Sequence, residues 1–478
     1  MSRMTRTVVL LTLAGVAWGS SRVAAQSPLT ADQAVKMALE RNSQSVAAEA
    51  GVLSAKGGVY GAYSGVLPHL SAGISRSGSR VDKASGSSLF GSFVTPSTTT
   101  DRLSYSTTPQ LSASWSLLNL SAIAGLTSAQ SGLKASRLSR EATRADVALA
   151  TRQQFYQVVQ AVKLVGVSNQ AVQLARDSER RVRVLFDVGS VSRNDVLQAQ
   201  VQTAQSQLDS IAARQSLLVQ RDLLAAQIGL EEARMGEVDT VLTFAPREFE
   251  EEALLREAGA NRPDLKAAEA QLRSAHAELL SAQVSRLPYV AVQGSAAFDP
   301  FTSFRQKSYG TSSVNGPSYV HPGSTDSLVH QDKIGSVLDP VTSGRSSSHR
   351  QYSASISLNW DFFDGLATDS RIATARGTLL RSQNGYDVLR RNLAGEVHEA
   401  VLTYGQALGS ESVAEAAVAS ATESMKLTQQ KYNVGSATIL DLITAEVALA
   451  RAQSQLVNAL AAIRVAEARI DRVRGHAE

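Results

Sequence analysis

Residues 186–190 read FDVGS and residues 432–436 read YNVGS, so the chain carries two near copies of one short segment. Each copy lies in a long tract without proline, from 110 to 245 and from 341 to 478. Both tracts are rich in Ala, Leu, Gln, Arg, Glu and Ser, a composition that favours long helices. Glycine commonly ends a helix because it tolerates a positive φ. Each copy is therefore predicted to be a turn at which a long helix reverses direction.

The helix before the second turn is predicted to be unusually long. Apolar residues from Ile372 to Ala407 recur at steps of three, four or seven, which keeps them on one helical face. A helix from about Leu366 to Tyr432 would measure roughly 100 Å at 1.5 Å per residue. After the turns, the hydroxyl side chains of Ser190, Ser436 and Thr438 can cap the next helix.

Four short segments alternate apolar and polar residues with a period of two, the pattern of strands. They span 70–75, 111–117, 290–298 and 352–362, and their polar positions are mostly Ser, Asn and Gln. Each is near the length of about ten residues that a tilted transmembrane strand needs. We predict four transmembrane strands with one face toward lipid and one toward water. The Ser-, Thr- and Gly-rich residues 76–109 and 301–350 are predicted to be long exposed loops.

The chain also repeats on a larger scale. Residues 47–50 read AAEA and recur at 267–270, and the Leu-Pro pair at 67–68 recurs at 287–288. Such self-similarity indicates two structural repeats, 26–230 and 261–478, joined by a connecting segment at 231–260.

The N-terminus is predicted to be a signal peptide over residues 1–25. Arg3 and Arg6 precede an apolar run at 8–18, and Val23-Ala24-Ala25 offers small residues for cleavage. The run is too short to span a bilayer. The chain has no cysteine, which excludes disulfides, thiolate metal sites and a lipidated N-terminal cysteine. We expect an exported protein that is not lipidated.

Composition excludes further classes of protein. With 478 residues, 43% of them hydrophobic, the chain is not wholly disordered. The formal charge of +4 falls to about +1 without the signal peptide, which gives no electrostatic argument for nucleic acid.

Four strands cannot close a barrel, which needs about eight, and open edges are not tolerated in hydrocarbon. Several copies must therefore pool their strands, and three copies would give twelve.

Together these features resemble the TolC-like outer-membrane factor family, also called outer membrane efflux proteins, over nearly the whole mature chain. The residues that carry the resemblance are Leu29-Thr30 with Ala34, Ala38 and Asn42, the two Leu-Pro pairs, residues 360–365 (WDFFDG), and the two turns. The resemblance implies an α+β membrane protein that forms a homotrimer in outer-membrane lipid. It also implies a twelve-strand β-barrel continuous with a twelve-helix periplasmic α-barrel. Such proteins are passive exit ducts of tripartite efflux or type I secretion systems, joined to an inner-membrane pump by a periplasmic adaptor.

The resemblance also assigns roles to the turns. Val188, Gly189 and Ser190, with Val434, Gly435 and Ser436, match tips that meet the adaptor, and Asp195, Asp441 and Tyr432 match residues that narrow the tunnel mouth. The chain departs from the family pattern at Ala437, which stands where an arginine can bond the tyrosine, and at Thr444, which replaces a second acid. Arg193 is a candidate substitute for the missing base. The alternative for both aspartates is a favourable charge in the first turn of a helix.

No enzyme motif is evident. The seven histidines lack zinc-ligand spacing, and His398-Glu399 lacks the second histidine of a metalloprotease helix. We therefore expect no catalytic residue, metal or cofactor. Two alternatives stay open: a periplasmic coiled-coil protein without a barrel, and a periplasmic enzyme that uses His321, His330 or His349.

Overall fold

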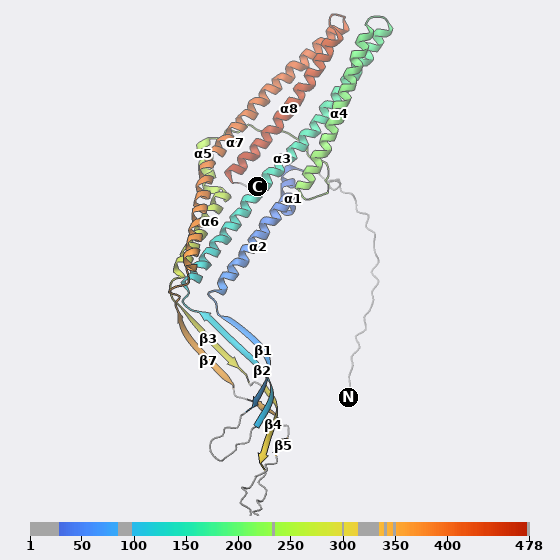
Figure 1. Cartoon of the computed structure of the whole chain (residues 1–478). Coiled ribbons are helices and arrows are strands. Elements are labelled where there is room, and N and C mark those ends of the chain that lie inside the picture. Colours follow the sequence, from blue (N-terminus) through green and yellow to red (C-terminus); the bar gives the residue numbers. More distant parts are fainter. Residues whose placement is uncertain are drawn as a thin grey trace, which may run out of the picture. The chain divides into compact units, whose positions relative to one another are not determined.

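The computed structural model describes residues 28–84, 98–231, 235–298, 301–313, 334–338, 342–347 and 350–475. The predicted signal peptide and the three loop histidines lie outside these residues. The chain divides into two compact units (Figure 1). Unit 1 comprises Met1–Val52, Ser136–Ala267 and Tyr386–Glu478, and unit 2 comprises Leu53–Ala135 and Ala268–Gly385.

Helices make up most of the described chain. They are α1 (Ala31–Arg41), α2 (Ser43–Ser64), α3 (Leu120–Asp187), α4 (Arg193–Gln227), α5 (Glu251–Asn261), α6 (Pro263–Val284), α7 (Ala367–Asn433) and α8 (Ile439–Arg474). The helices α3 and α7 have 68 and 67 residues, so the predicted helix over 366–432 is confirmed to within one residue at each end. Among the described residues, no helix is both long enough and apolar enough to span a membrane.

The strands of unit 2 form one antiparallel sheet. They are β1 (His69–Ala84), β2 (Thr98–Ser116), β3 (Tyr289–Ala297), β4 (Phe301–Ser313), β5 (Ile334–Leu338), β6 (Thr342–Ser347) and β7 (Gln351–Asn359). β2 pairs β1 on one side and both β3 and β4 on the other; β7 pairs β3, while β6 and β5 pair β4. The pairing Ala297↔Gln351 is followed by Phe301↔Ser347 in the same register. The sheet therefore has four ribbons: β1, β2, β3 with β4, and β7 with β6 and β5.

The four predicted strands are confirmed as strands, but two of the predicted bounds are wrong. β7 ends at Asn359, because residues 360–366 form the connection to α7, so the predicted continuation to residue 362 is not strand. The predicted loops are also too long. β1 runs on to Ala84 and β2 starts at Thr98, and strands β4, β5 and β6 occupy much of 301–350. The reason is that Ser- and Thr-rich segments satisfy their backbone groups by pairing with one another, whatever their composition suggests about loops.

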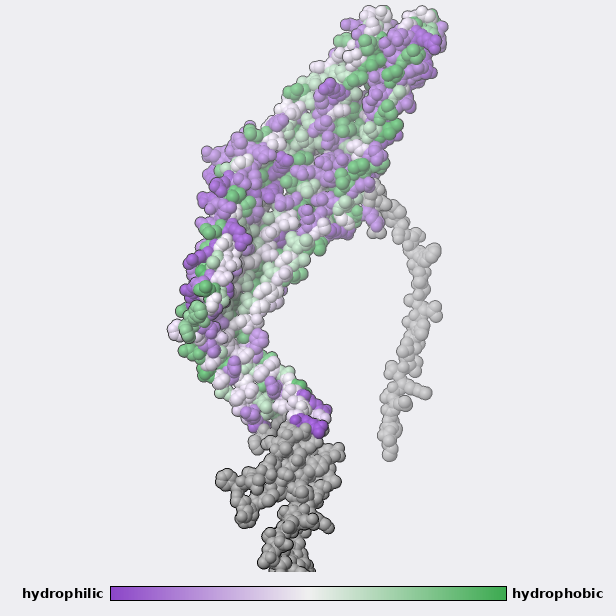
Figure 2. Space-filling model, in the orientation of Figure 1, coloured by the Kyte–Doolittle hydropathy of each residue, from purple (hydrophilic) through white to green (hydrophobic). Residues whose placement is uncertain are grey.

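The sheet has one apolar and one polar face. Leu70 pairs Ala113, Val292 pairs Ile356, and Val290 pairs Leu358 on the first face. On the second, Ser71 and Ser112 share a hydrogen bond of 2.6 Å, as do Ser295 and Ser353 at 2.7 Å. The apolar face is not a buried core, because its side chains are exposed in the single chain: Leu70 73%, Ile74 77%, Ile356 77% and Leu358 70%. Figure 2 shows mainly pale or apolar residues on the visible part of this sheet.

Two of the three apolar clusters among the described residues of unit 1 lie away from the turns. One joins α1, α3 and α4 around Val158, Val159 and Leu224, and the other joins α5, α7 and α8 around Val397 and Ile463. These clusters are narrow because each helix packs a stripe rather than a broad face.

Candidate functional site: the two hairpin tips

The two turns predicted from the sequence have the same backbone geometry. Gly189 and Gly435 both have φ of 76°. At the first turn the Gly189 amide donates to the Phe186 carbonyl at 2.9 Å, and the Ser190 amide donates to the Leu185 carbonyl at 2.8 Å. This pair of bonds is the Schellman motif, which satisfies the last carbonyls of a helix.

The second turn repeats those bonds. The Gly435 amide donates to Tyr432 at 3.0 Å and the Ser436 amide donates to Lys431 at 2.9 Å. We call residues 186–195 the first tip and residues 432–441 the second tip. The positive φ requires glycine at both, since a side chain there would be strained.

Each helix that follows a turn begins with a capping box. The Ser192 amide donates to the Asp195 carboxylate at 2.9 Å, and the Asp195 amide donates to the Ser192 hydroxyl at 3.3 Å. Thr438 and Asp441 make the same exchange at 2.9 and 3.2 Å. The prediction for Thr438 is confirmed. The prediction that Ser190 or Ser436 caps is wrong, because α4 and α8 begin only at Arg193 and Ile439, and their N-caps are Ser192 and Thr438.

The capping boxes decide what the two aspartates do in a single chain. Hydrogen bonds from Thr438 hold the pKa of the Asp441 carboxyl below its usual value, so it is ionised at neutral pH. Its negative charge lies in the first turn of α8, where it interacts favourably with the positive end of the helix dipole. A helix-capping role is therefore present at both aspartates, and the gate assignment stays a prediction.

The outer ends of the tips are exposed. The side chains of Val188 and Val434 are 70% and 79% exposed, and a Cβ added at either glycine would meet no atom within 4 Å. Arg193, the candidate substitute base, is also exposed. Each of the two turns therefore exposes one valine side chain that the chain itself leaves uncovered.

The two tips pack against each other through a small apolar cluster. Val182, Ala199, Tyr432, Ile439 and Leu442 are buried in it. Beside it lies a groove of about 590 Å³ that both tips line. The lining residues are Leu185, Gly189, Ser190, Val191, Ser192, Asp195, Tyr432, Asn433, Gly435, Ala437, Thr438 and Ile439. Half of the tip residues predicted from the sequence line this groove, namely Gly189, Ser190, Asp195, Tyr432 and Gly435. The other half, Val188, Arg193, Val434, Ser436 and Asp441, are not among its lining residues.

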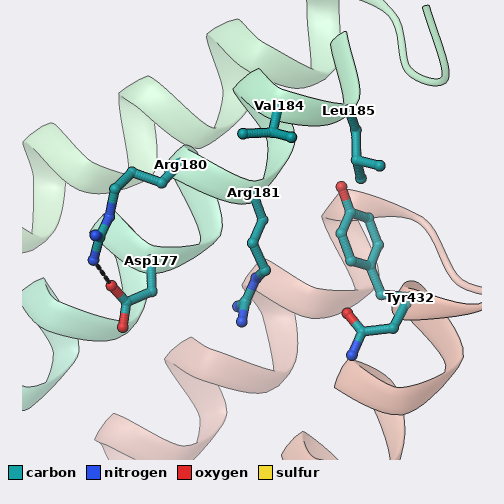
Figure 3. Close-up of a pocket in the computed structure, with 7 residues that line it drawn as sticks. Asp177, Arg180, Arg181, Val184, Leu185 and Tyr432 are labelled. Atoms are coloured by element: carbon teal, nitrogen blue, oxygen red, sulfur yellow. Dashed lines mark hydrogen bonds and ion pairs between the residues drawn. The ribbon is translucent and has the colours of Figure 1, made fainter. Parts of the chain in front are cut away.

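Tyr432 occupies the centre of this contact. Its side chain is 7% exposed, and among the described residues its hydroxyl has no hydrogen-bond partner. Burial, with a smaller contribution from the Asp195 charge, raises the pKa of the phenol above its usual value. In Figure 3 its ring stands between α3 and α7, with the hydroxyl directed toward Leu185. The phenol is therefore neutral at physiological pH.

A buried polar group lies next to Tyr432 and was not predicted from the sequence. The Ser178 hydroxyl donates to the Glu446 carboxyl at 2.5 Å, and the Arg181 guanidinium donates to Ser178 at 3.1 Å. Glu446 is 5% exposed, and burial raises the pKa of its carboxyl. The sequence does place Glu446 among the apolar positions of α8. A single sequence does not show, however, whether such an acidic residue is buried or exposed.

No set of three or more His, Cys, Asp or Glu side chains suited to a metal ion occurs in the part of the chain that the structure describes.

Comparisons with known proteins agree with the fold. The family model described as outer membrane efflux protein matches residues 34–230 and 254–476. Outer membrane protein TolC of Salmonella enteritidis is 21% identical over 359 residues, which cover 74% of this chain and 66% of that protein. The outer membrane protein VceC of Vibrio cholerae has a TM-score of 0.72 at 18% identity, over 93% of this chain and 96% of that one. The outer membrane channel CmeC of Campylobacter jejuni gives 0.72 and 18%, over 93% and 85%.

Proposed function

The chain belongs to the outer membrane efflux protein family, and from this premise we propose that three copies form a passive exit duct across the periplasm and the outer membrane. The observation that carries the proposal is the sheet of unit 2. One of its faces is apolar and exposed, and the other is lined with serine. An exposed apolar face of this kind is stable in hydrocarbon, with the serine face toward a water-filled lumen.

The edges of the sheet support assembly from several copies. In the described part of the chain β1 pairs only with β2, and β7 pairs only with β3. Unpaired backbone groups are too costly in a bilayer, so each edge needs a partner strand. With four ribbons per chain, three copies give a closed barrel of twelve, wide enough for a water-filled bore.

Exposed aromatic side chains follow β7, at the end of the sheet that connects to α7. Trp360, Phe362 and Phe363 are 63%, 87% and 75% exposed. Aromatic residues concentrate at membrane–water interfaces, so this cluster suits the periplasmic boundary of the bilayer.

The two tips are the proposed docking site for a periplasmic adaptor, which would join the duct to an inner-membrane pump. Their shared turn geometry and exposed valines support equivalent contacts at each tip. Asp195, Asp441, Tyr432 and Arg193 are the proposed residues of the tunnel mouth. In this role the capped aspartates would give a ring of negative charge that favours cations and water.

The other candidate functions are weaker. A coiled-coil protein without a barrel predicts no strands, and the sheet contradicts it. The family is one of channels, and the lack of enzymatic activity remains part of the proposal. We also propose that the chain consists of two repeats, 26–230 and 261–478, joined at 231–260.

The proposed function is tested by deleting the gene and measuring tolerance to a panel of toxic compounds. Reduced tolerance that is restored by the wild-type chain supports a duct. Unchanged tolerance and unchanged secretion, or a fully soluble periplasmic product, would reject it.

A further inference from the structure

Two equivalent connections join the sheet to the long helices, and their side chains differ in chemistry. Residues 115–119, which begin at the end of β2, read WSLLN, and residues 360–364, which follow β7, read WDFFD. We call residues 115–119 the first junction and residues 360–364 the second junction. Both lie in unit 2, and the long helices α3 and α7 follow them.

The tryptophan of each junction makes the same hydrogen bond. The Trp115 indole N–H donates to the Val66 carbonyl at 2.8 Å. The Trp360 indole N–H donates to the Arg286 carbonyl at 3.1 Å. Each acceptor residue directly precedes one of the two Leu-Pro pairs, so the two bonds occupy equivalent places in the chain.

The last side chain of each junction also has the same task, which is to cap the helix that follows. The Asn119 side-chain oxygen accepts a hydrogen bond from the Ala122 amide at 3.0 Å. The Asp364 carboxylate accepts one from the Thr368 amide at 2.8 Å. The two junctions therefore share their hydrogen bonds to the chain, and the remaining side chains are available for another purpose.

Those remaining side chains differ between the junctions. The first junction and its acceptor have Val66, Ser116, Leu117 and Leu118, and the second have Arg286, Asp361, Phe362 and Phe363 at the same places. Both junctions are exposed and apolar, since Leu118 is 62% exposed and Phe363 is 75% exposed. Leucines are sufficient for an apolar contact with a bilayer. The rings, carboxylate and guanidinium of the second junction therefore indicate recognition of a particular chemical group.

The second junction forms a cleft of about 330 Å³. Its lining includes the three aromatic residues and four charged ones, Arg286, Asp361, Asp364 and Asp369. Arg286 forms an ion pair with Asp369, and an Arg371 nitrogen lies 3.6 Å from the Asp364 carboxylate. Within the part of the chain that the structure describes, the Asp361 carboxylate makes neither a hydrogen bond nor an ion pair. One negative charge of the cleft is therefore uncompensated.

An aromatic cleft with a free carboxylate suits an ammonium group. The faces of aromatic rings attract a cation, and a carboxylate accepts strong hydrogen bonds from its N–H groups. The neighbouring Arg286 side chain is 55% exposed and uses only one nitrogen on Asp369, so further N–H donors remain for a phosphate. A group that carries an ammonium and a phosphate on one short linker matches both parts of the cleft.

We propose that the second junction binds the headgroup of a phospholipid with a primary ammonium group, as in phosphatidylethanolamine. Asp361 and the rings hold the ammonium, and Arg286 holds the phosphate. The inference rests on the proposed function, which places the sheet in a bilayer.

The occupant is a lipid because the cleft continues the apolar face of the sheet. The second junction comes directly after β7, whose Leu358 is 70% exposed on that face, and Phe362 is 87% exposed. A free amine would leave these side chains in water, whereas the acyl chains of a lipid cover them. The uncompensated charge of Asp361 repels the headgroups of anionic lipids.

Native mass spectrometry of the protein purified from outer membranes tests the headgroup site. The protein is delipidated and mixed with equal amounts of phosphatidylethanolamine and phosphatidylglycerol, and the lipids retained by each trimer are counted. We expect phosphatidylethanolamine to be retained over phosphatidylglycerol by about tenfold, the factor that one hydrogen bond between charged groups supplies.

The first junction supplies matched variants. Asp361→Ser copies one of its residues, and Asp361→Ser with Phe362→Leu and Phe363→Leu copies three while keeping the junction apolar. We expect both variants to retain the two lipids equally. Phe363→Ala should lower the preference, whereas Leu118→Ala, at the equivalent place in the first junction, should leave it unchanged.

Three results would overturn the headgroup site. Equal retention of the two lipids by the wild-type trimer, or an unchanged preference in the triple variant, would refute the site and leave the proposed function standing. Spectra that show only monomers without retained lipid would refute the headgroup site and the trimeric duct together.

Discussion

The two tips have the same backbone but different side-chain packing. Their glycines share a φ of 76°, and their Schellman bonds and capping boxes match bond for bond. At the position three residues before the glycine, however, Phe186 is 42% exposed and Tyr432 is 7% exposed. The two tips therefore share the turn, but only the second tip places an aromatic ring between the hairpins.

This difference separates two kinds of role. Features that both tips share, namely the turn and the exposed valine, suit the repeated contact that we propose with an adaptor. Features of the second hairpin alone, Tyr432 and the nearby Glu446, suit the contact between hairpins within one chain. At the position of Glu446 the first hairpin has Gln200. The predictions below test this division.

The largest effect is expected from placing valine at both turn glycines. Gly189→Val with Gly435→Val forces a β-branched residue into the left-handed region, at a cost of roughly 1–2 kcal/mol or more for each turn. We expect tolerance to toxic compounds to fall by about tenfold while the trimer persists, because about 1.4 kcal/mol already corresponds to a factor of ten. Each single variant should lose less tolerance than the double variant, and the two single variants should lose about the same amount.

Gly166→Val is the control for the turn variants. Gly166 lies within α3, where an added Cβ would meet no atom within 4 Å. Unchanged tolerance in both single turn variants would remove the docking assignment.

The next effect distinguishes the aromatic residues. Tyr432→Ala removes a buried ring and should destabilise the contact between hairpins by about 3–5 kcal/mol, the range for large buried aromatics. Phe186→Ala should cost about 1 kcal/mol or less, as an exposed position does. Hydrogen exchange of amides in α7 and α8 near the second tip measures both.

Tyr432→Phe sharpens the same comparison. It removes a buried hydroxyl that has no partner in the described chain and keeps the ring. We expect no loss of protection, or a small gain, because an unsatisfied buried hydroxyl is unfavourable. A loss as large as that of Tyr432→Ala would mean that the hydroxyl makes an essential bond in the assembled protein.

A smaller and equal effect is expected at the helix starts. Ser192→Ala and Thr438→Ala each remove a capping side chain and should cost about 1 kcal/mol. Protection of the first amides of α4 and α8 is the readout. Because the two boxes have matching distances, a marked inequality between the variants would contradict their equivalence.

The smallest effect concerns pH and the second hairpin alone. Burial raises the pKa of Glu446 above its usual 4.5, so the neutral acid contributes stability that is complete below about pH 4.5. That contribution is lost as the pH rises through the raised pKa, with a slope of at most about 1.4 kcal/mol per pH unit. Glu446→Gln copies the residue of the first hairpin and should abolish this decline.

Asp441 should show the opposite sign. Hydrogen bonds from Thr438 lower its pKa below 3.8, so its contribution to the free energy of unfolding is present above that value and is lost as the pH falls.

Hydrogen exchange of α8 amides between pH 4 and 8, in wild type and in Glu446→Gln, measures the Glu446 contribution. An unchanged pH profile in the variant would show that Glu446 is not neutral in the fold.

Local patterns in the sequence predicted most of the fold. The positions of the turn glycines, the long helix before the second turn and the four strand segments all follow from periodicity and from proline and glycine placement. The extent of β1 and β2 beyond those segments could not be predicted, because Ser- and Thr-rich strands pair through their backbones and leave no hydropathy signal. The caps were misplaced by two residues in the first tip because both Ser190 and Ser192 are suitable N-cap residues.

The candidate site was predicted only in part. The tip residues were identified from the repeated segment. The bond between Ser178 and Glu446, however, joins two residues 268 positions apart in the sequence and depends on how the hairpins pack. Packing between distant helices is therefore what the structure adds.

The central claim is that the sheet of one chain is completed by the sheets of other copies. The most direct test is a cryo-electron microscopy structure of the protein purified from outer membranes. The account predicts threefold symmetry, with β1 of each copy hydrogen-bonded to β7 of the next. A single-chain particle in which β1 and β7 pair with each other, or stay unpaired, would contradict it.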